Sequence, residues 1–125
     1  MSKDVLCLYE DEDIQVAVEK FKQVNLMSLP VLNRAEHVCG TLALYEVVEW
    51  FQKATDLRTS WQDQVKHIMK RQVVTVQPDQ ELQDLIPYFV ERSFNYIPVV
   101  DNKALVGIIS RADMIAALYR LLQHR

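Results

Sequence analysis

The sequence contains few of the residues that special structural solutions require. Only two glycines, four prolines and two cysteines occur among its 125 residues. Both cysteines, Cys7 and Cys39, stand in apolar runs, where a free thiol behaves as a small hydrophobic side chain. No signal-peptide pattern opens the chain, and no apolar run approaches the ~20 residues of a membrane span. We therefore expect a soluble, cytoplasmic protein without membrane insertion, although a soluble domain of a larger membrane protein would have the same composition.

The sequence also lacks a positive excess, a metal-ligand pattern and a catalytic set. It carries 14 Lys and Arg against 17 Asp and Glu, a formal net charge of -3, whereas nucleic-acid binding needs a concentrated positive face. The basic residues between Lys66 and Arg71 are better explained as a solvated helix end. The three histidines are scattered without metal-ligand spacing, and no base accompanies either cysteine. The sequence therefore predicts that the chain has no nucleic-acid partner, no metal site and no enzymatic activity.

What the chain does contain is an internal repeat. The run Ser-Leu-Pro-Val-Leu around Pro30 resembles the run Tyr-Ile-Pro-Val-Val around Pro98, 68 positions further on. The same offset aligns further apolar and acidic positions, and Gly40 matches Gly107 at an offset of 67. So many matches at one offset indicate two copies of one unit.

Each copy predicts the same order of elements: strand, helix, strand, strand, helix. The helices show apolar residues at helical spacing, and the strands are β-rich runs. The expected strands are 5–8, 29–32 and 38–44 in the first copy and 73–76, 97–100 and 105–109 in the second. We expect a first unit at 1–54, a linker at 55–64 and a second unit at 65–125. Because neither unit covers its own sheet well, we expect an α/β (α+β) fold with the two sheets packed together.

One residue conflicts with this pattern. Pro87 falls inside the first helix of the second unit, where proline costs about 3 kcal/mol and removes a hydrogen bond. We expect a kink there, or a helix that is irregular near Gln83.

The segment from Gly107 to Asp113 carries the most informative chemistry. Ser110 and Asp113 have the spacing of a capping box, which explains them structurally. The same atoms also suit a nucleotide, because a helix N-terminus attracts phosphate and a carboxylate accepts hydrogen bonds from ribose hydroxyls. Arg111 could pair with phosphate, and Gly107 permits the close approach of a ligand or a second backbone. On local grounds alone, the structural interpretation is favoured.

The combined motifs resemble the CBS domain, named after cystathionine β-synthase. The resemblance rests on the runs 65–69, 73–79, 97–101 and 107–113; it covers residues 65–122 closely and residues 4–52 more loosely. CBS domains occur in pairs called Bateman modules. The resemblance therefore implies two tandem β-α-β-β-α units with pseudo-two-fold symmetry and clefts between them. It also implies regulation by an adenosine-containing ligand, AMP, ADP, ATP or S-adenosylmethionine, without a tightly bound cofactor.

The resemblance assigns ligand contacts residue by residue. Asp113 would hold the ribose hydroxyls, Ser110 would contact ribose or phosphate, and Arg111 is a further candidate for phosphate. The other predicted contacts, from the motif and an apolar base pocket, are Gly107, Ile108, Asn95, Met27, Leu26 and Leu6. The first unit departs from the pattern, because Ala43 replaces the hydroxyl and Glu46 replaces the aspartate. Its cleft, with Glu46 and Tyr96, is the doubtful one.

Two functional hypotheses follow. The first is a regulatory module that senses the ligand and passes the signal to a fused or separate effector protein. The alternative is a structural dimerisation module without a ligand, in which Ser110 and Asp113 only cap a helix. The resemblance further implies a homodimer formed through the apolar terminal helix.

Overall fold

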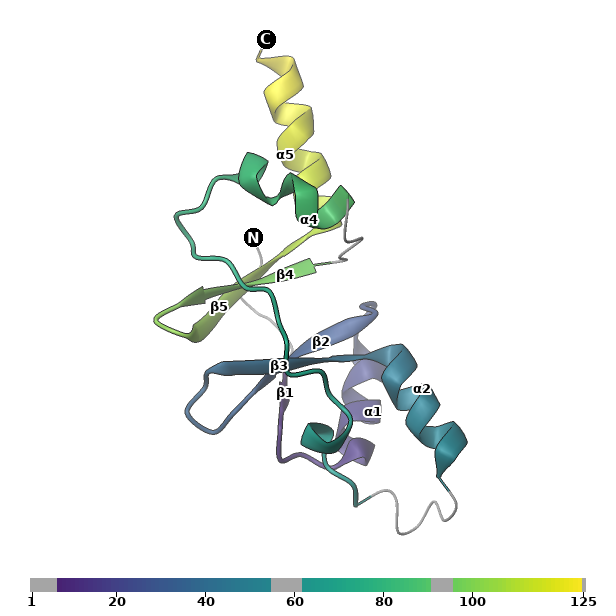
Figure 1. Ribbon diagram of the computed structural model, residues 1–125. Coiled ribbons are helices and arrows are strands. Elements are labelled where there is room, and N and C mark those ends of the chain that lie inside the picture. The colour runs from purple at the N-terminus through teal and green to yellow at the C-terminus, as the bar shows by residue number, and fades with distance from the viewer. Residues whose placement is uncertain (1–6, 55–61, 91–95, 125) are drawn as a thin grey trace. The chain divides into compact units, whose positions relative to one another are not determined.

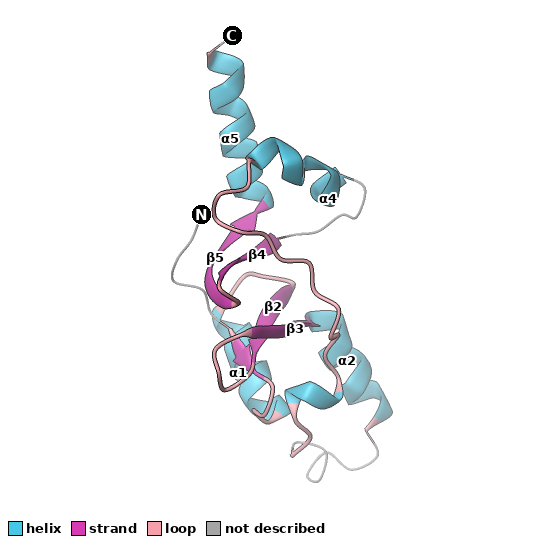
Figure 2. Cartoon of the chain, turned by 60° about the vertical axis from the view of Figure 1, so that its left-hand side comes forward, coloured by secondary structure: helices cyan, strands magenta, loops and turns pink. Residues whose placement is uncertain are grey.

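The computed structural model describes residues 7–54, 62–90 and 96–124. Within these ranges the chain forms two compact units that are divided between Val73 and Val74. We call them the first unit and the second unit. Each combines a small β-sheet with helices (Figure 2), which confirms the expected mixed α/β fold.

The first unit contains a three-stranded sheet with two helices beside it (Figure 1). Its elements are β1 Leu8–Tyr9, α1 Ile14–Gln23, β2 Ser28–Leu32, β3 Val38–Ala43, α2 Leu44–Lys53 and the 3-10 turn η1 Val65–His67. β1 runs parallel to β2, and β3 runs antiparallel to it. The helices bury apolar positions that the helical spacing predicted, among them Ile14, Ala17 and Phe21 on α1 and Val47 on α2.

The second unit repeats this order in a reduced form. Its elements are η2 Leu82–Leu85, α4 Ile86–Val90, β4 Tyr96–Asp101, β5 Ala104–Ser110 and α5 Arg111–Gln123. β4 and β5 form an antiparallel hairpin. In place of the opening strand expected at 73–76, Val76 alone makes a parallel bridge to Val99. The C-terminal part of α5 extends beyond the sheet of its own unit (Figures 1 and 2).

The repeat extends to the register of the strands. The equivalent pairs are Leu8–Val31 and Val31–Gly40 in the first unit, and Val76–Val99 and Val99–Gly107 in the second. In each unit a β-bulge shifts the register directly after the residue that faces the glycine. The core positions correspond as well, since Leu29 and Ile97 are both fully buried. The two units therefore share one architecture down to individual residue pairs.

Pro87 breaks the first helix of the second unit, as its position predicts. Residues 82–85 form a 3-10 helix, and an α-helix begins only at Ile86. Pro87 has no N–H to donate to the carbonyl of Gln83 four residues earlier. The N–H of Ile86 donates to that carbonyl instead. The irregularity near Gln83 thus satisfies an acceptor that a continuous α-helix would leave without its partner.

Residues 63–70, which we call the strap, pack in the first unit. Val65 is fully buried in the core of that unit and Met69 is 9% exposed. The N–H of Ile14 donates to the carbonyl of Asp63 at 2.8 Å. The second copy of the repeat, which matches from residue 65 onward, therefore contributes its opening residues to the first unit. Residues 55–61 of the predicted linker lie outside the described residues, and the boundaries drawn at 1–54, 55–64 and 65–125 stay a prediction.

The strap is held against β3 at the one place where β3 has no side chain. Thr41 and Lys70 exchange two backbone hydrogen bonds of 2.9 Å. A Cβ atom added at Gly40 would lie 2.5 Å from the carbonyl oxygen of Lys70 and 3.0 Å from Sδ of Met69. Both distances are shorter than ordinary van der Waals contacts, so glycine is required here for the close approach of a second backbone.

Replacing Gly40 tests this contact. We expect Gly40→Ala to lower the free energy of unfolding by roughly 1–3 kcal/mol, because the new methyl group must displace a backbone carbonyl that is itself hydrogen-bonded. Urea unfolding followed by circular dichroism measures the change. Ser28→Ala, at a half-exposed end of β2, is the control and should shift stability by less than about 0.5 kcal/mol. Equal stability of the two variants would show that the strap moves aside without cost.

Candidate functional site

The predicted motif forms the junction of β5 and α5. Gly107 and Ile108 are buried within β5, and Ser110 ends the strand and serves as the N-cap of α5. The N–H of Ser110 donates to Oδ2 of Asp113 at 2.8 Å, and the N–H of Asp113 donates to Oγ of Ser110 at 3.2 Å. The predicted capping box is thus present. It fixes both side chains at a helix N-terminus.

The capping box engages the Asp113 carboxylate. A carboxylate offers about four lone-pair positions, and the bond from Ser110 N–H occupies one of them. Asp113 and Ser110 are half-buried, whereas Arg111 is exposed at the start of α5. The carboxylate that caps the helix is thus partly exposed at the N-terminus of α5. Tyr96, predicted for the other cleft, is buried in β4 and pairs with Ser110 across the hairpin.

The first unit keeps half of this arrangement. Oε1 of Glu46 accepts the N–H of Ala43 at 2.8 Å, so Glu46 reaches back to the N-cap as Asp113 does. The side chain of Ala43 has no oxygen with which to complete the box. The carbonyl of Met27 accepts the N–H of Leu44 at 2.8 Å, which ties Met27 to the start of α2. The glutamate has therefore replaced the aspartate in its structural role, without the hydroxyl beside it.

The predicted base-pocket residues lie in different surroundings. The side chain of Met27 is 60% exposed, next to the N-terminus of α2. Leu26 is half-buried and packs against the core of the first unit. Leu6 and Asn95 lie outside the described residues. The structure thus places Met27 beside the first-unit motif and gives Leu26 a packing role in the core.

Three further side chains near Glu46 were not predicted as site residues. Tyr45, Trp50 and Lys70 line a cavity of about 400 Å³ between α2 and the strap, together with Glu46, Glu49, Lys53 and Ile68. Nζ of Lys70 lies 5.2 Å from the centre of the Tyr45 ring. A hydrogen bond to Tyr45 is the main cause that raises the pKa of Lys70. The basic run of the sequence contained this lysine, but the run alone gave no indication that the strap would bring it to α2.

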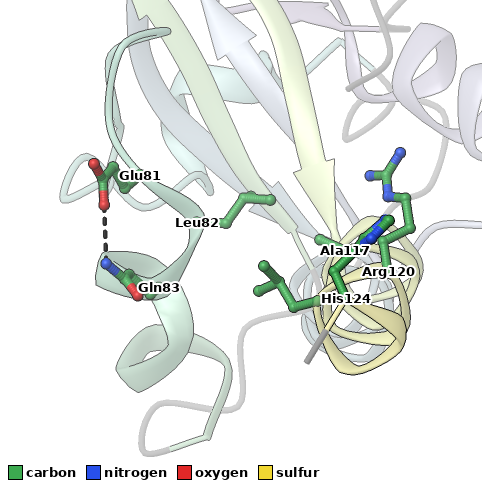
Figure 3. A pocket seen from close by; sticks show the side chains of 7 residues that line it. Glu81, Leu82, Gln83, Ala117, Arg120 and His124 are labelled. Carbon is green, nitrogen blue, oxygen red and sulfur yellow. Dashed lines mark hydrogen bonds between the residues drawn. The ribbon is translucent and has the colours of Figure 1, made fainter.

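Another cavity, of about 420 Å³, lies in the second unit between η2 and the C-terminal part of α5 (Figure 3). Leu82, Ala117 and Leu121 supply its apolar surface. On one wall, Nε2 of Gln83 donates a hydrogen bond to Oε2 of Glu81 at 2.9 Å. Arg120 and His124 lie on the opposite wall. Because Ser110 is at the opposite end of α5, this cavity is separate from the motif.

The two cysteines lack the features of activated nucleophiles. Burial raises the pKa of the Cys7 thiol and of the Cys39 thiol. The thiol of Cys39 is also 3.7 Å from the Glu10 carboxylate, which favours the neutral form. A raised pKa reduces the thiolate that nucleophilic catalysis requires. Across the described ranges, no three His, Cys, Asp or Glu side chains converge as a metal site would need, and no helix has the length and apolar character to cross a membrane.

The two α/β units have the same strand register, and in each of them the last strand leads into a helix whose N-cap N–H is bound by a carboxylate. The chain is therefore a tandem-repeat protein. The chain belongs to the CBS domain family, whose model matches residues 1–53 and 65–120. It is therefore a pair of CBS domains, a class of regulatory module.

Three relatives illustrate the reach of this similarity. Uncharacterized protein MJ1426 of Methanocaldococcus jannaschii is 23% identical over 146 aligned residues, which cover 93% of this chain and 87% of that protein. The carnitine transport ATP-binding protein OpuCA of Listeria monocytogenes is 27% identical, but the match covers 95% of this chain and only 28% of OpuCA. The crystal structure of CBSX2 in complex with AMP has the same fold, with a TM-score of 0.81 at 20% identity, covering 97% of this chain and 93% of CBSX2.

The difference between the two helix caps can be tested by exchanging them. We expect Ala43→Ser to raise the free energy of unfolding by about 1 kcal/mol, because the hydroxyl would complete the capping box of α2. The reverse change, Ser110→Ala, should lower it by a similar amount in the second unit. Thermal unfolding by calorimetry measures both. A loss of stability in Ala43→Ser would show that the N-cap of α2 has no room for a hydroxyl.

Proposed function

We propose that the chain is a ligand-sensing regulatory module that binds an adenosine-containing ligand in the cleft between its two CBS units. The observation that supports this most is the half-buried Asp113 carboxylate, which is fixed by Ser110 at the N-terminus of α5. The bound AMP of the related CBSX2 structure supports the ligand class. AMP, ADP, ATP and S-adenosylmethionine are the candidates, each as a regulatory ligand and none as a tightly bound cofactor.

In this proposal each motif residue has a distinct role. Asp113 accepts hydrogen bonds from the ribose hydroxyls, and Ser110 contacts ribose or phosphate. The exposed Arg111 guanidinium and the N-terminus of α5 favour the phosphate. The adenine ring lies against an apolar pocket formed by Ile108, Leu26, Met27, Leu6 and Asn95. Ligand binding then shifts the population between arrangements of the two units, and that shift is the signal to a fused or separate effector.

The second cleft, at Glu46 and Tyr96, is the weaker site in this proposal. Glu46 is one methylene longer than aspartate and already accepts the N–H of Ala43. We further propose that the chain has no enzymatic activity of its own, binds no nucleic acid and works in the cytoplasm. The composition and the raised thiol pKa values support these points.

Ligand-induced stabilisation tests the proposed site. A ligand that binds only the folded state adds about 2.7 kcal/mol at a hundredfold excess over its Kd. We therefore expect at least one of AMP, ADP, ATP and S-adenosylmethionine to raise the Tm at millimolar concentration. Asp113→Ala should abolish the rise measured from its own ligand-free Tm, whereas Glu46→Gln should keep most of it. No rise with any of the four, or the same rise in Asp113→Ala, would contradict the proposal.

Homodimerisation is the second proposed property, and equivalent exposed side chains on the two units support it. On α5, Ile115 is 66% exposed and Leu118 is 36% exposed. Their repeat equivalents on α2, Val48 and Phe51, are 61% and 54% exposed. Apolar residues kept at the same exposed positions in both copies indicate a surface that a partner covers. A second copy of the chain is the partner we propose, because a symmetric dimer brings the same surfaces of both copies together.

Charged substitutions on these faces test the dimer. We expect the wild-type chain to sediment as a dimer and Ile115→Asp or Val48→Asp to sediment as a monomer, because each variant would bury a carboxylate without a partner. Ala116→Glu, exposed on another side of α5, is the matched control and should stay dimeric. A monomeric wild-type chain at high micromolar concentration would contradict dimerisation while leaving ligand binding by the monomer open to its own test.

A further inference from the structure

The cavity between η2 and α5 lies where the first unit is closed by its own chain. Leu82, on the η2 side, is the repeat equivalent of Ile14. Ala117, on the α5 side, is the equivalent of Trp50. In the first unit the strap joins these two positions: the carbonyl of Asp63 accepts the N–H of Ile14 at 2.8 Å, and Oδ2 of Asp63 accepts the indole N–H of Trp50 at 2.9 Å. The cavity therefore marks the place that an indole ring and a peptide segment occupy in the first unit.

The second unit has neither of these groups in the described residues. Ala117 has only a methyl group where Trp50 has its ring. Within the described ranges, no segment distant in sequence bonds to the backbone of η2. Leu82 is consequently only half-buried, whereas Ile14 is fully buried, and Leu121 on the α5 side of the cavity is 60% exposed. An apolar surface that one copy covers and the other leaves open suits an apolar group from another molecule.

The charges on α5 differ from those on α2 in the same sense. In the first unit Nζ of Lys53 pairs with Oε1 of Glu49 at 2.9 Å, one turn earlier on α2. The equivalents on α5 are Arg120 and Ala116, so no carboxylate stands one turn before the arginine. Among the described residues, Arg120 takes part in no ion pair. The guanidinium, with the imidazole of His124 one turn further on, can therefore bind a carboxylate from outside the chain.

The cavity lies on a different side of α5 from the surface proposed for dimerisation. Successive residues of an α-helix are rotated by about 100°, so Ala117 is about 200° around α5 from Ile115. The opposite wall of the cavity belongs to η2, where Gln83 donates to Glu81 (Figure 3). A dimer formed through Ile115 would thus leave the cavity open to a further molecule.

We propose that the cavity between η2 and α5 binds a peptide segment of a partner protein, in which one large apolar side chain and one carboxylate lie close together. The apolar side chain packs against Leu82, Ala117 and Leu121, in the place that Trp50 holds in the first unit. The carboxylate pairs with Arg120. A peptide is the occupant because a peptide segment, the strap, closes the equivalent place in the first unit.

The test uses a peptide with the sequence of residues 60–65, acetylated and amidated, in which a tryptophan and an aspartate stand two positions apart. In an extended peptide these two side chains point to the same side. ¹⁵N–¹H NMR of the full chain follows the amide signal of Leu82. We expect a saturable shift with a Kd in the millimolar range. Matched peptides with alanine for the tryptophan, or asparagine for the aspartate, should bind at least about fivefold more weakly.

Variants of the apolar wall give a second measurement. Ala117→Trp places in the cavity the ring that Trp50 supplies in the first unit, and should remove the shift at Leu82. Leu121→Gln changes an exposed residue of the same wall and should raise the Kd at least about threefold. The apolar contact is therefore tested even if the larger indole destabilises the core around Ala117.

Matched variants of the cation complete the experiment. Arg120→Gln should raise the Kd about tenfold, as expected for one charge-assisted hydrogen bond. Lys53→Gln, at the equivalent position of the first unit, is the control and should change the Kd less than twofold. Ile115→Asp should also leave the Kd within twofold, because the dimer surface is separate.

Three results would overturn the proposal: equal losses in the Arg120 and Lys53 variants, equal binding of the three peptides, or no shift at Leu82. A Leu82 signal that moves with the concentration of the chain alone would also contradict it. That result would show that a second copy of the chain, and no partner peptide, covers the cavity.

Discussion

The contact between Gly40 and the backbone of Lys70 is the constraint on which the first unit depends. It lets the strap lie directly on β3, where Thr41 and Lys70 exchange two hydrogen bonds. Those bonds place Val65 and Met69 in the core and bring Lys70 to α2. A glycine in a motif of this kind is easily interpreted as space for a ligand. In the first unit the space is filled by protein backbone, and the consequence for chemistry is indirect: the backbone contact positions a cation.

The β5–α5 junction shows that structural and functional interpretations of a motif need not compete. The side chains of Ser110 and Asp113 satisfy two backbone N–H donors at the start of α5. The same bonds hold the carboxylate in one orientation, and a fixed acceptor binds a diol at a lower entropic cost than a mobile one. The capping box is therefore part of what would make the site suitable. In the first unit, Glu46 performs the capping role without the neighbouring hydroxyl, so capping alone does not preserve the full set of ligand groups.

The parts of the fold that the sequence predicted are those with a local or repeated signal. The offset between Pro30 and Pro98 leads to strands whose registers agree residue by residue, and Pro87 breaks its helix where its missing N–H requires. The location of the strap was not predictable in the same way, because its hydrogen bonds join residues far apart in the sequence. Leu26 and Met27 illustrate the same limit at the site. Both are apolar neighbours, but one packs on the core and the other is exposed, a difference that depends on tertiary packing.

The two units show how a duplicated fold can acquire unequal sites. Core positions and bulges are retained in both copies, because a change there would cost stability in either unit. Positions around the helix N-terminus have diverged: Ser110 corresponds to Ala43, and Ala112 corresponds to Tyr45. The first unit therefore lacks the hydroxyl and has an aromatic ring beside Lys70. Tyr45 is 54% exposed, so the packing of the first unit depends little on its side chain. The symmetry of the scaffold therefore places little restriction on the side chains around each helix N-terminus.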